Sequence, residues 1–203
     1  LGPAEAAGLV EIRLDGDVAF THPLFAAAVY RDASPDERRA VHRDLSGTAP
    51  DFEERARHAA LAATGPDPIV ALVLVQAAAR ARARGATSVA AELLELSIRL
   101  TPADEDDERL RRELLLADDL HHAGEPARAE AVLAAALDHA PSDESRAEAL
   151  LALGFIRREN DVRTAIAACE AALAAAESSG LIARAHATLA RLYETVDVNR
   201  ATV

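Results

Sequence analysis

The sequence contains no lysine, methionine or tryptophan, and aromatic residues make up only 3% of its 203 positions. All of its basic side chains, apart from histidine, are therefore arginines. Hydrophobic residues reach 50% and are mostly alanine and leucine, which favour close-packed helices over sheets. The length is sufficient to bury a core. The scarcity of large flat side chains thus predicts helices that pack through small ones.

An excess of positive charge is also missing, because the net charge is −12. A nucleic-acid-binding surface usually shows a basic excess, so we expect no direct nucleic-acid binding by this segment. The longest apolar run, Ile69 to Ala79, falls short of the roughly 20 residues that a membrane span needs. No signal peptide is visible. We predict a cytoplasmic protein without a membrane partner, and a fragment of a longer one because it begins at Leu1.

Cysteine occurs once, so no disulfide can form within the chain. Cys169 lies in the alanine-rich stretch "AIAACEAALAAA", which indicates a small core residue and not a nucleophile. We find no serine–histidine–aspartate arrangement in a nucleophile elbow and no paired carboxylates that would form a catalytic site. We therefore expect no enzyme activity, no catalytic residue and no cofactor in this segment.

Strand-like runs occur only near the beginning. "GLVEIRL" and "DVAFTH" alternate roughly and flank Asp15-Gly16, a pair typical of hairpin turns. Pro23 then suits the first turn of a helix. Ser34, followed by proline and by Glu37, predicts a capping box at the start of the next helix, which we expect to end at Gly47.

The rest of the sequence predicts helices joined by short turns. We expect them near 51–64, 68–84, 87–100, 105–122, 126–139, 144–158, 162–178 and 181–194. The acidic run Ala103 to Glu108 suits a helix start, where carboxylates complement the dipole. Metal binding is not expected there, since the run lacks calcium-ligand spacing and a loop glycine.

Two of these helix pairs repeat. Gly85 and Gly124 are 39 positions apart, and so are Pro102 and Pro141. Between them, matching positions carry Ala90 and Ala129, then Leu94 and Leu133, then Ser97 and Ala136. A third copy has Asn160 in place of the glycine, followed by Ala165, Cys169 and Ala172; a fourth begins near Leu189. Asparagine is the next-best residue for a left-handed turn.

This pattern is typical of degenerate tetratricopeptide-like repeats, in which helix hairpins stack into a solenoid. Glycine or asparagine reverses the chain, small residues allow helices to approach, and proline ends the unit. The predicted fold is all-α: a solenoid of helix hairpins over 49–203, with a small β-hairpin in an N-terminal part over 1–48.

The order of these parts resembles the large ATP-binding transcriptional regulators of the LuxR family, within the signal-transduction ATPases with numerous domains (STAND). The resemblance covers nearly the whole chain. It is sharpest in "FTHPLFAAAVY", in "ERRAVHRDL" and in "AAARARARGATSVAAELLELSIRLTP". It implies that 1–48 is the C-terminal part of a winged-helix domain and that 49–203 belongs to a helical-repeat sensor.

The resemblance also implies a function. The segment would bind a protein partner or small inducer on the concave face formed by the first helix of each pair, and would couple that binding to a neighbouring ATPase domain. His22 would sense the phosphate of ADP in the full-length protein, where an imidazole and a helix start both suit an anion. Four residues on, where the family often has arginine, this chain has Ala26. The phosphate-binding loop G-x-x-x-x-G-K-[ST] is absent from this segment, so any ATP site lies elsewhere.

Three alternatives follow from the residues themselves. His22 could instead cap the join between strand and helix. The adjacent His121 and His122 point about 100° apart, which favours a solvated helix end over a metal site. Arg80, Arg82 and Arg84 could form a basic patch, but ion pairs with the abundant carboxylates are the simpler interpretation.

The whole segment could also be a stand-alone repeat adaptor that binds peptide tails. Adaptors of one kind clamp a carboxylate with lysine and asparagine. That mode is disfavoured here, because lysine is absent and the asparagines are Asn160 and Asn199.

Overall fold

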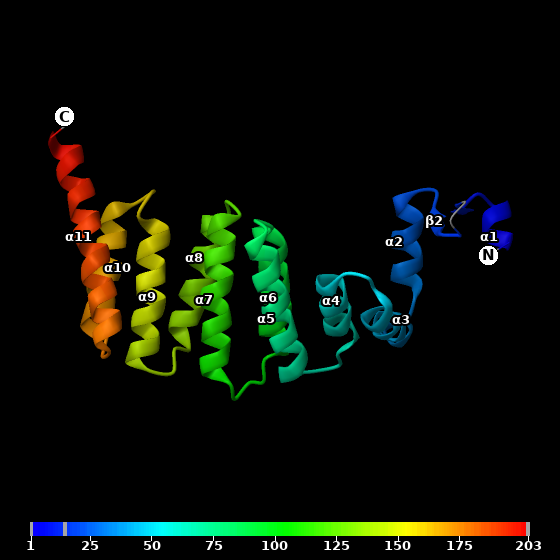
Figure 1. Ribbon diagram of the computed structural model, residues 1–203, viewed down its shortest axis with the longest axis horizontal. Helices are drawn as coiled ribbons and strands as arrows, with labels where there is room; N and C mark the ends of the chain where they lie inside the picture. Colours follow the sequence, from blue (N-terminus) through cyan, green and yellow to red (C-terminus); the bar gives the residue numbers. More distant parts are fainter. Residues whose placement is uncertain (1, 14–15, 202–203) are drawn as a thin grey trace.

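The computed structural model describes residues 2–13 and 16–201, with the backbone alone for 196–201. Within these residues it contains eleven helices and one two-stranded sheet (Figure 1). The elements are α1 (Gly2–Ala6), β1 (Val10–Ile12), β2 (Val18–Phe20), α2 (Pro23–Asp32), α3 (Pro35–Thr48), α4 (Phe52–Ala62), α5 (Pro68–Ala83), α6 (Thr87–Leu100), α7 (Asp106–His122), α8 (Pro126–Asp138), α9 (Asp143–Arg157), α10 (Val162–Ala175) and α11 (Ser179–Ala201). The predicted all-α repeat fold with an N-terminal hairpin is confirmed.

The N-terminal hairpin pairs β1 with β2 in antiparallel register, with Val10 opposite Phe20. Gly16 has a φ of 89°, a conformation that glycine adopts without strain, so a glycine is suited to this turn. Asp15, the other residue of the predicted turn, lies outside the described residues. The short helix α1 was not expected from the sequence.

Helix starts follow from local chemistry. Pro23 opens α2, and Ser34 forms the predicted capping box with Glu37. Aspartates accept backbone N–H groups at the starts of α4, α5 and α10, from positions Asp51, Asp67 and Asp161. One predicted end was wrong: α3 does not stop at Gly47 but continues to Thr48, because this glycine adopts ordinary helical geometry with open space around it.

The repeat turns confirm the role of glycine at two positions. Gly85 and Gly124 have φ values of 81° and 82°. In the first turn, Ala86 N–H donates to Ala81 O, and in the second Glu125 N–H donates to Leu120 O. These bonds close the helix ends in the Schellman pattern, so both units reverse direction in the same way.

The third turn does not follow this pattern. Among the described residues no residue other than glycine has a positive φ, so the expectation that Asn160 adopts a left-handed conformation was wrong. The chain leaves α9 through Arg158 in right-handed helical geometry. Asn160 and Asp161 N–H then both donate to Arg157 O, and the Asp161 side chain caps α10. A tight local turn with an aspartate cap thus replaces the glycine.

The second helix of each unit packs through small residues, as predicted. The matching positions of α6, α8 and α10 are completely buried: Ala90, Ala129 and Ala165, then Leu94, Leu133 and Cys169, then Ser97, Ala136 and Ala172. Consecutive helices from α3 to α11 contact one another, and so do the alternate pairs α4–α6, α7–α9 and α9–α11. The result is an elongated stack of hairpins (Figure 1).

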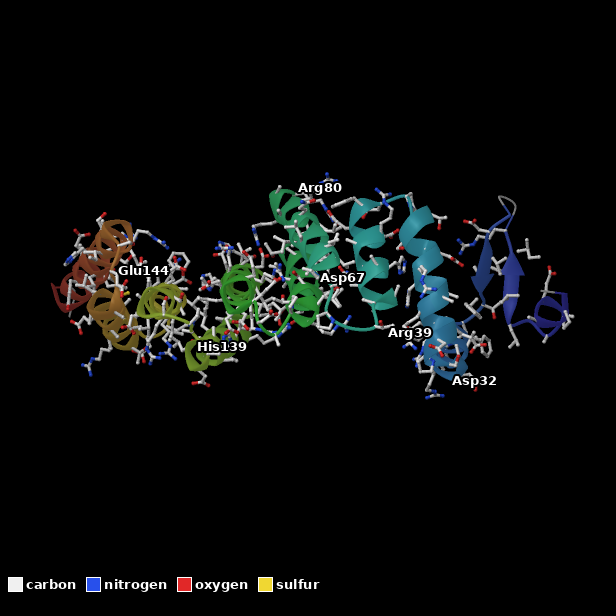
Figure 2. The ribbon with its side chains drawn as sticks, turned by 90° about the horizontal axis from the view of Figure 1, so that it is seen from below. Asp32, Arg39, Asp67, Arg80, His139 and Glu144 are labelled. Carbon is white, nitrogen blue, oxygen red and sulfur yellow. The ribbon has the colours of Figure 1, made fainter. Side chains whose placement is uncertain are left out.

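The buried core begins at α4. Its largest cluster runs from Ala56 to Ile156, and a second one joins α9, α10 and α11. In the described part of 1–48, by contrast, only Val10 and His42 are buried. Figure 2 shows side chains crowded between the repeat helices, while the hairpin stands apart. No helix among the described residues is long and apolar enough to cross a membrane.

Candidate binding groove

A groove of about 720 Å³ crosses the first helices of three successive units, α7, α9 and α11. It lies on the side where the sequence placed the concave binding face. Its apolar lining includes Leu114 and Leu115 of α7 and Leu151, Ala152 and Phe155 of α9. A volume of this size is typical of ligand-binding clefts, so this groove is the strongest candidate site among the described residues.

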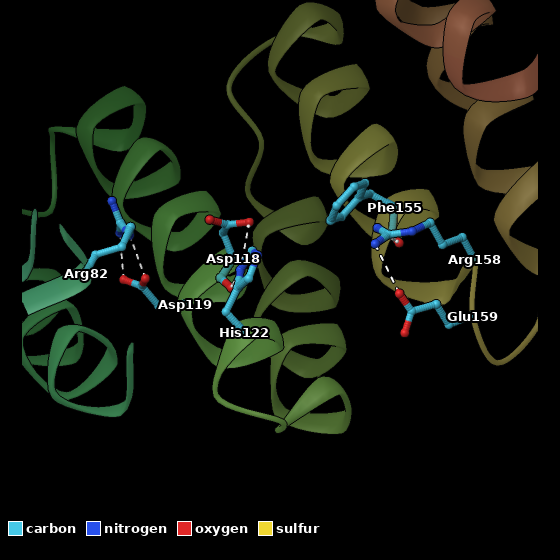
Figure 3. Close-up of polar contacts among 7 residues, drawn as sticks. All are labelled: Arg82, Asp118, Asp119, His122, Phe155, Arg158 and Glu159. Carbon is cyan, nitrogen blue, oxygen red and sulfur yellow. Dashed lines mark hydrogen bonds and ion pairs between the residues drawn. The ribbon is translucent and has the colours of Figure 1, made fainter. Parts of the chain in front are cut away.

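Phe155 is the exposed aromatic of the groove, with 38% of its surface accessible. The Arg158 guanidinium lies 3.5 Å from its ring centroid and also pairs with Glu159 (Figure 3). On another side, the His121 ring meets Phe155 at a centroid distance of 5.8 Å. The cation–π contact with Arg158 and the edge-to-face contact with His121 orient the phenyl ring before any ligand arrives.

The groove also carries charge. Arg111 lines it from α7, and Arg184 and Arg191 line it from α11, while its carboxylates are Asp118 and Glu148. Arg111 pairs with Glu108 on its own helix. Arginines therefore stand on both outer helices of a groove whose middle helix supplies the apolar floor.

The arginine cluster of α5 does not form a basic patch. Arg82 makes a two-point ion pair with Asp119 of α7, with both N–O distances 2.6 Å (Figure 3). Arg84 pairs with Glu53 of α4, and Arg80 lies 4.1 Å from the Phe52 ring centroid. The interpretation as ion pairs is confirmed for Arg82 and Arg84, which connect α5 to helices on either side of it.

His22 lies at the join between β2 and α2, as the sequence indicated. The Leu24 N–H donates to His22 Nδ1 at 3.1 Å, so the ring caps the helix. Because Nδ1 accepts this bond, the proton of the neutral ring sits on Nε2. The side chain is exposed, which leaves Nε2 able to donate to another group.

The two adjacent histidines do not converge on one point. His122 Nδ1 donates to the Asp118 carbonyl at 2.8 Å and lies 3.5 Å from its carboxylate (Figure 3). His121 instead turns towards Phe155. No group of three or more potential metal ligands gathers in the part of the chain that is described.

Cys169 is completely buried against α9, as predicted. Burial raises the pKa of its thiol, which keeps it protonated and unreactive at neutral pH. Gly154 of α9 faces it, and a Cβ added there would overlap the Cys169 sulfur and lie 3.1 Å from the Ala165 carbonyl oxygen. A glycine in the middle of the helix "LLALGFIR" was the sequence signal for this close approach.

A chain of three polar rings joins α2, α3 and α4, and the sequence did not reveal it. His42 Nε2 lies 3.1 Å from the Tyr30 hydroxyl, and His42 Nδ1 lies 3.0 Å from His58 Nδ1. Arg38 lies over the Tyr30 ring at 5.3 Å. Neither histidine forms an ion pair with a carboxylate among the described residues. One proton must lie between the two Nδ1 atoms, so only one ring can be an imidazolium without breaking the contact.

We expect acid to weaken this junction. Burial lowers the pKa of His42, and the nearby His58 charge lowers it further. The unfolded chain therefore binds the proton more readily, so the stabilisation is present above the ordinary histidine pKa of ~6.5 and is lost as the pH falls below that value and through the lower pKa of the folded state. Urea midpoints should drop between about pH 7.5 and about pH 5.5.

Two variants test the origin of this drop. His58→Phe retains a flat ring without a second proton and should make the midpoint less dependent on pH. His186→Gln changes an exposed histidine on α11 and should leave the dependence as it is. An unchanged dependence in His58→Phe would contradict the assignment.

Comparisons with protein-family models, with curated proteins and with solved structures find no match to this chain. What supports a function is therefore the chain's own groove, its charges and its exposed N-terminal face.

Proposed function

We propose that this chain is the central sensor and scaffold segment of an ATP-dependent transcriptional regulator. In this role the groove of α7, α9 and α11 binds a partner or inducer, and residues 1–48 connect the repeats to a neighbouring ATPase domain. The observation that carries the proposal is the groove itself, with the exposed Phe155 on its floor.

The N-terminal part supports the second half of the proposal. Helix α2 has no buried residue, although Leu24, Val29 and Tyr30 are 69%, 58% and 49% exposed. An apolar face of this kind marks a surface that another domain covers. The resemblance to STAND regulators suggests the ATPase domain as that partner, with ADP or ATP bound there and not in this segment.

His22 would then take part in the nucleotide switch. Its exposed Nε2–H can donate to a phosphate oxygen, and the first turn of α2 behind it adds a favourable dipole. A contact made only in the ADP-bound state would bias the protein towards that state, because a ligand shifts an equilibrium only through different affinities for its two forms.

The test uses the full-length protein and two readouts. Phe155→Ala should abolish inducible transcription from a target promoter, whereas Tyr193→Ala, which changes an exposed aromatic hydrogen-bonded to Glu170 of α10, should not. His22→Ala should lower the ADP that co-purifies with the protein, and His186→Ala should not. Unchanged ADP and unchanged induction would reject the regulator and favour the stand-alone adaptor.

A further inference from the structure

Two arginines on α11 lack an ionic partner among the described side chains. Arg184 and Arg191 are exposed, line the groove and make no ion pair with any described residue. They are seven positions apart, so they lie on one face of the helix two turns from each other. The chain has 34 acidic residues for 22 arginines, and Arg111, on the other side of the groove, does pair with a carboxylate. Arg184 and Arg191 therefore offer two positive charges, on one face of one groove, to a ligand.

Apolar surface lies beside these cations. Leu151 and Phe155 of α9 are four positions apart and form the floor next to α11. Arg111 of α7 stands on the opposite side. The groove thus presents an apolar strip with arginines along both edges. Of its two carboxylates, Asp118 already faces His122, and Glu148 forms no ion pair within the described part of the chain.

We propose that this groove binds an amphipathic protein segment whose apolar side chains enter the strip and whose carboxylates pair with Arg184 and Arg191. The inference rests on the proposed function in one respect, since it names the partner class of the same groove. Helices that dock into grooves present apolar residues at i, i+3, i+4 and i+7. On such a helix, two carboxylates seven positions apart lie two turns from each other, which is the separation of Arg184 and Arg191.

The shape and charge of the site favour a protein segment over other ligands. The strip crosses three neighbouring helices and its aromatic floor stays exposed, so a small molecule would remain largely in contact with water. Nucleic acid is disfavoured because its phosphates would approach a chain with a net charge of −12, which repels a polyanion.

The test measures fluorescence anisotropy of labelled helical peptides with the full 203-residue chain. The probe peptide carries leucines at i, i+3, i+4 and i+7 and glutamates at the flanking positions. In matched peptides the glutamates become lysine or glutamine. We expect the glutamate peptide to bind about tenfold more tightly than the lysine peptide. Its affinity should decrease as the salt concentration rises.

Variants of the chain locate the contact. The double variant Arg184→Glu, Arg191→Glu should bind the glutamate peptide about tenfold more weakly than the unchanged chain does, and should bind the lysine peptide more tightly. Phe155→Ala should weaken the binding of all three peptides, as expected for a central aromatic anchor. Arg163→Glu reverses an exposed arginine on α10, outside the groove, and should change nothing.

Two results would overturn the inference: no binding of the glutamate peptide, or equal affinity before and after the arginine reversal. Its failure is distinct from failure of the proposed function. If Phe155→Ala loses induction but the arginine reversal does not change peptide binding, the groove is retained as the binding site and the acidic partner is rejected. If the chain recognises the glutamate peptide but Phe155→Ala shows normal induction, the acidic partner is retained and the regulatory role is rejected.

Discussion

Replacing Arg82 with leucine should lower the free energy of unfolding by about 3 kcal/mol, because it leaves a buried carboxylate without its counter-charge. Asp119 is completely buried, and both of its carboxylate oxygens accept from the Arg82 guanidinium. The pair also joins the last turn of α5 to α7 in the next unit. Urea unfolding followed by circular dichroism measures the loss.

A double-mutant cycle separates the buried charge from lost packing. Asp119→Leu in the Arg82→Leu background removes the orphaned carboxylate, so the double variant should recover most of the stability. Arg57→Leu is the matched control, since its pair with Glu92 is exposed at 2.7 Å, and it should cost less than about 1 kcal/mol. Additive losses in the cycle would contradict the assignment.

Adding a single methyl group at Gly154 should destabilise the α9–α10 hairpin by roughly 3 kcal/mol, because the new Cβ overlaps a buried sulfur. The better helix propensity of alanine offsets about 1 kcal/mol of the clash. Substitution of this residue therefore tests how closely α9 and α10 must approach. Thermal unfolding and urea unfolding of Gly154→Ala both measure the effect.

The Cys169 sulfur provides the control for this second prediction. Cys169→Ala alone should cost about 1 kcal/mol, since it leaves a small cavity. Combined with Gly154→Ala, it removes the overlapping atom, so the double variant should be more stable than Gly154→Ala by itself. Gly47→Ala introduces the same methyl group at a helical glycine with open space around it, and it should be neutral or stabilising. If the double variant loses as much stability as the two single variants together, the sulfur is not what opposes the added methyl group.

The repeat units were predictable because their signals are local. The spacing from Gly85 to Gly124 encodes identical helix ends, and the small residues at matching positions after them are buried: Ala90 and Ala129, then Ser97 and Ala136. The prediction of a left-handed turn at Asn160 was wrong because the sequence alone does not say which way a chain leaves a helix. Its neighbour Asp161 supplied a side-chain cap, and that cap made a left-handed residue unnecessary.

The groove and the ring chain could be predicted only in part. The resemblance implied a binding face on the first helix of each pair, and the groove lies on such helices, but nothing in the sequence indicated which side chains would meet there. Phe155, Arg184 and Arg191 come from different helices, and only the stacking of the units brings them to one surface. The contact of His42 with His58 likewise depends on how α3 packs on α4. Such contacts depend on three-dimensional packing and produce no periodic pattern in the sequence.

The stack of hairpins has a consequence for how the chain is made. Among the described residues, the repeat helices contact mainly the next helix or the next but one, so few contacts require a distant part of the sequence. Folding can start in any unit and spread to its neighbours, without the entropic cost of closing a long loop. The N-terminal units can therefore acquire their structure while α11 is still being synthesised. Since the groove needs α7, α9 and α11 together, it cannot be complete before α11 has been synthesised.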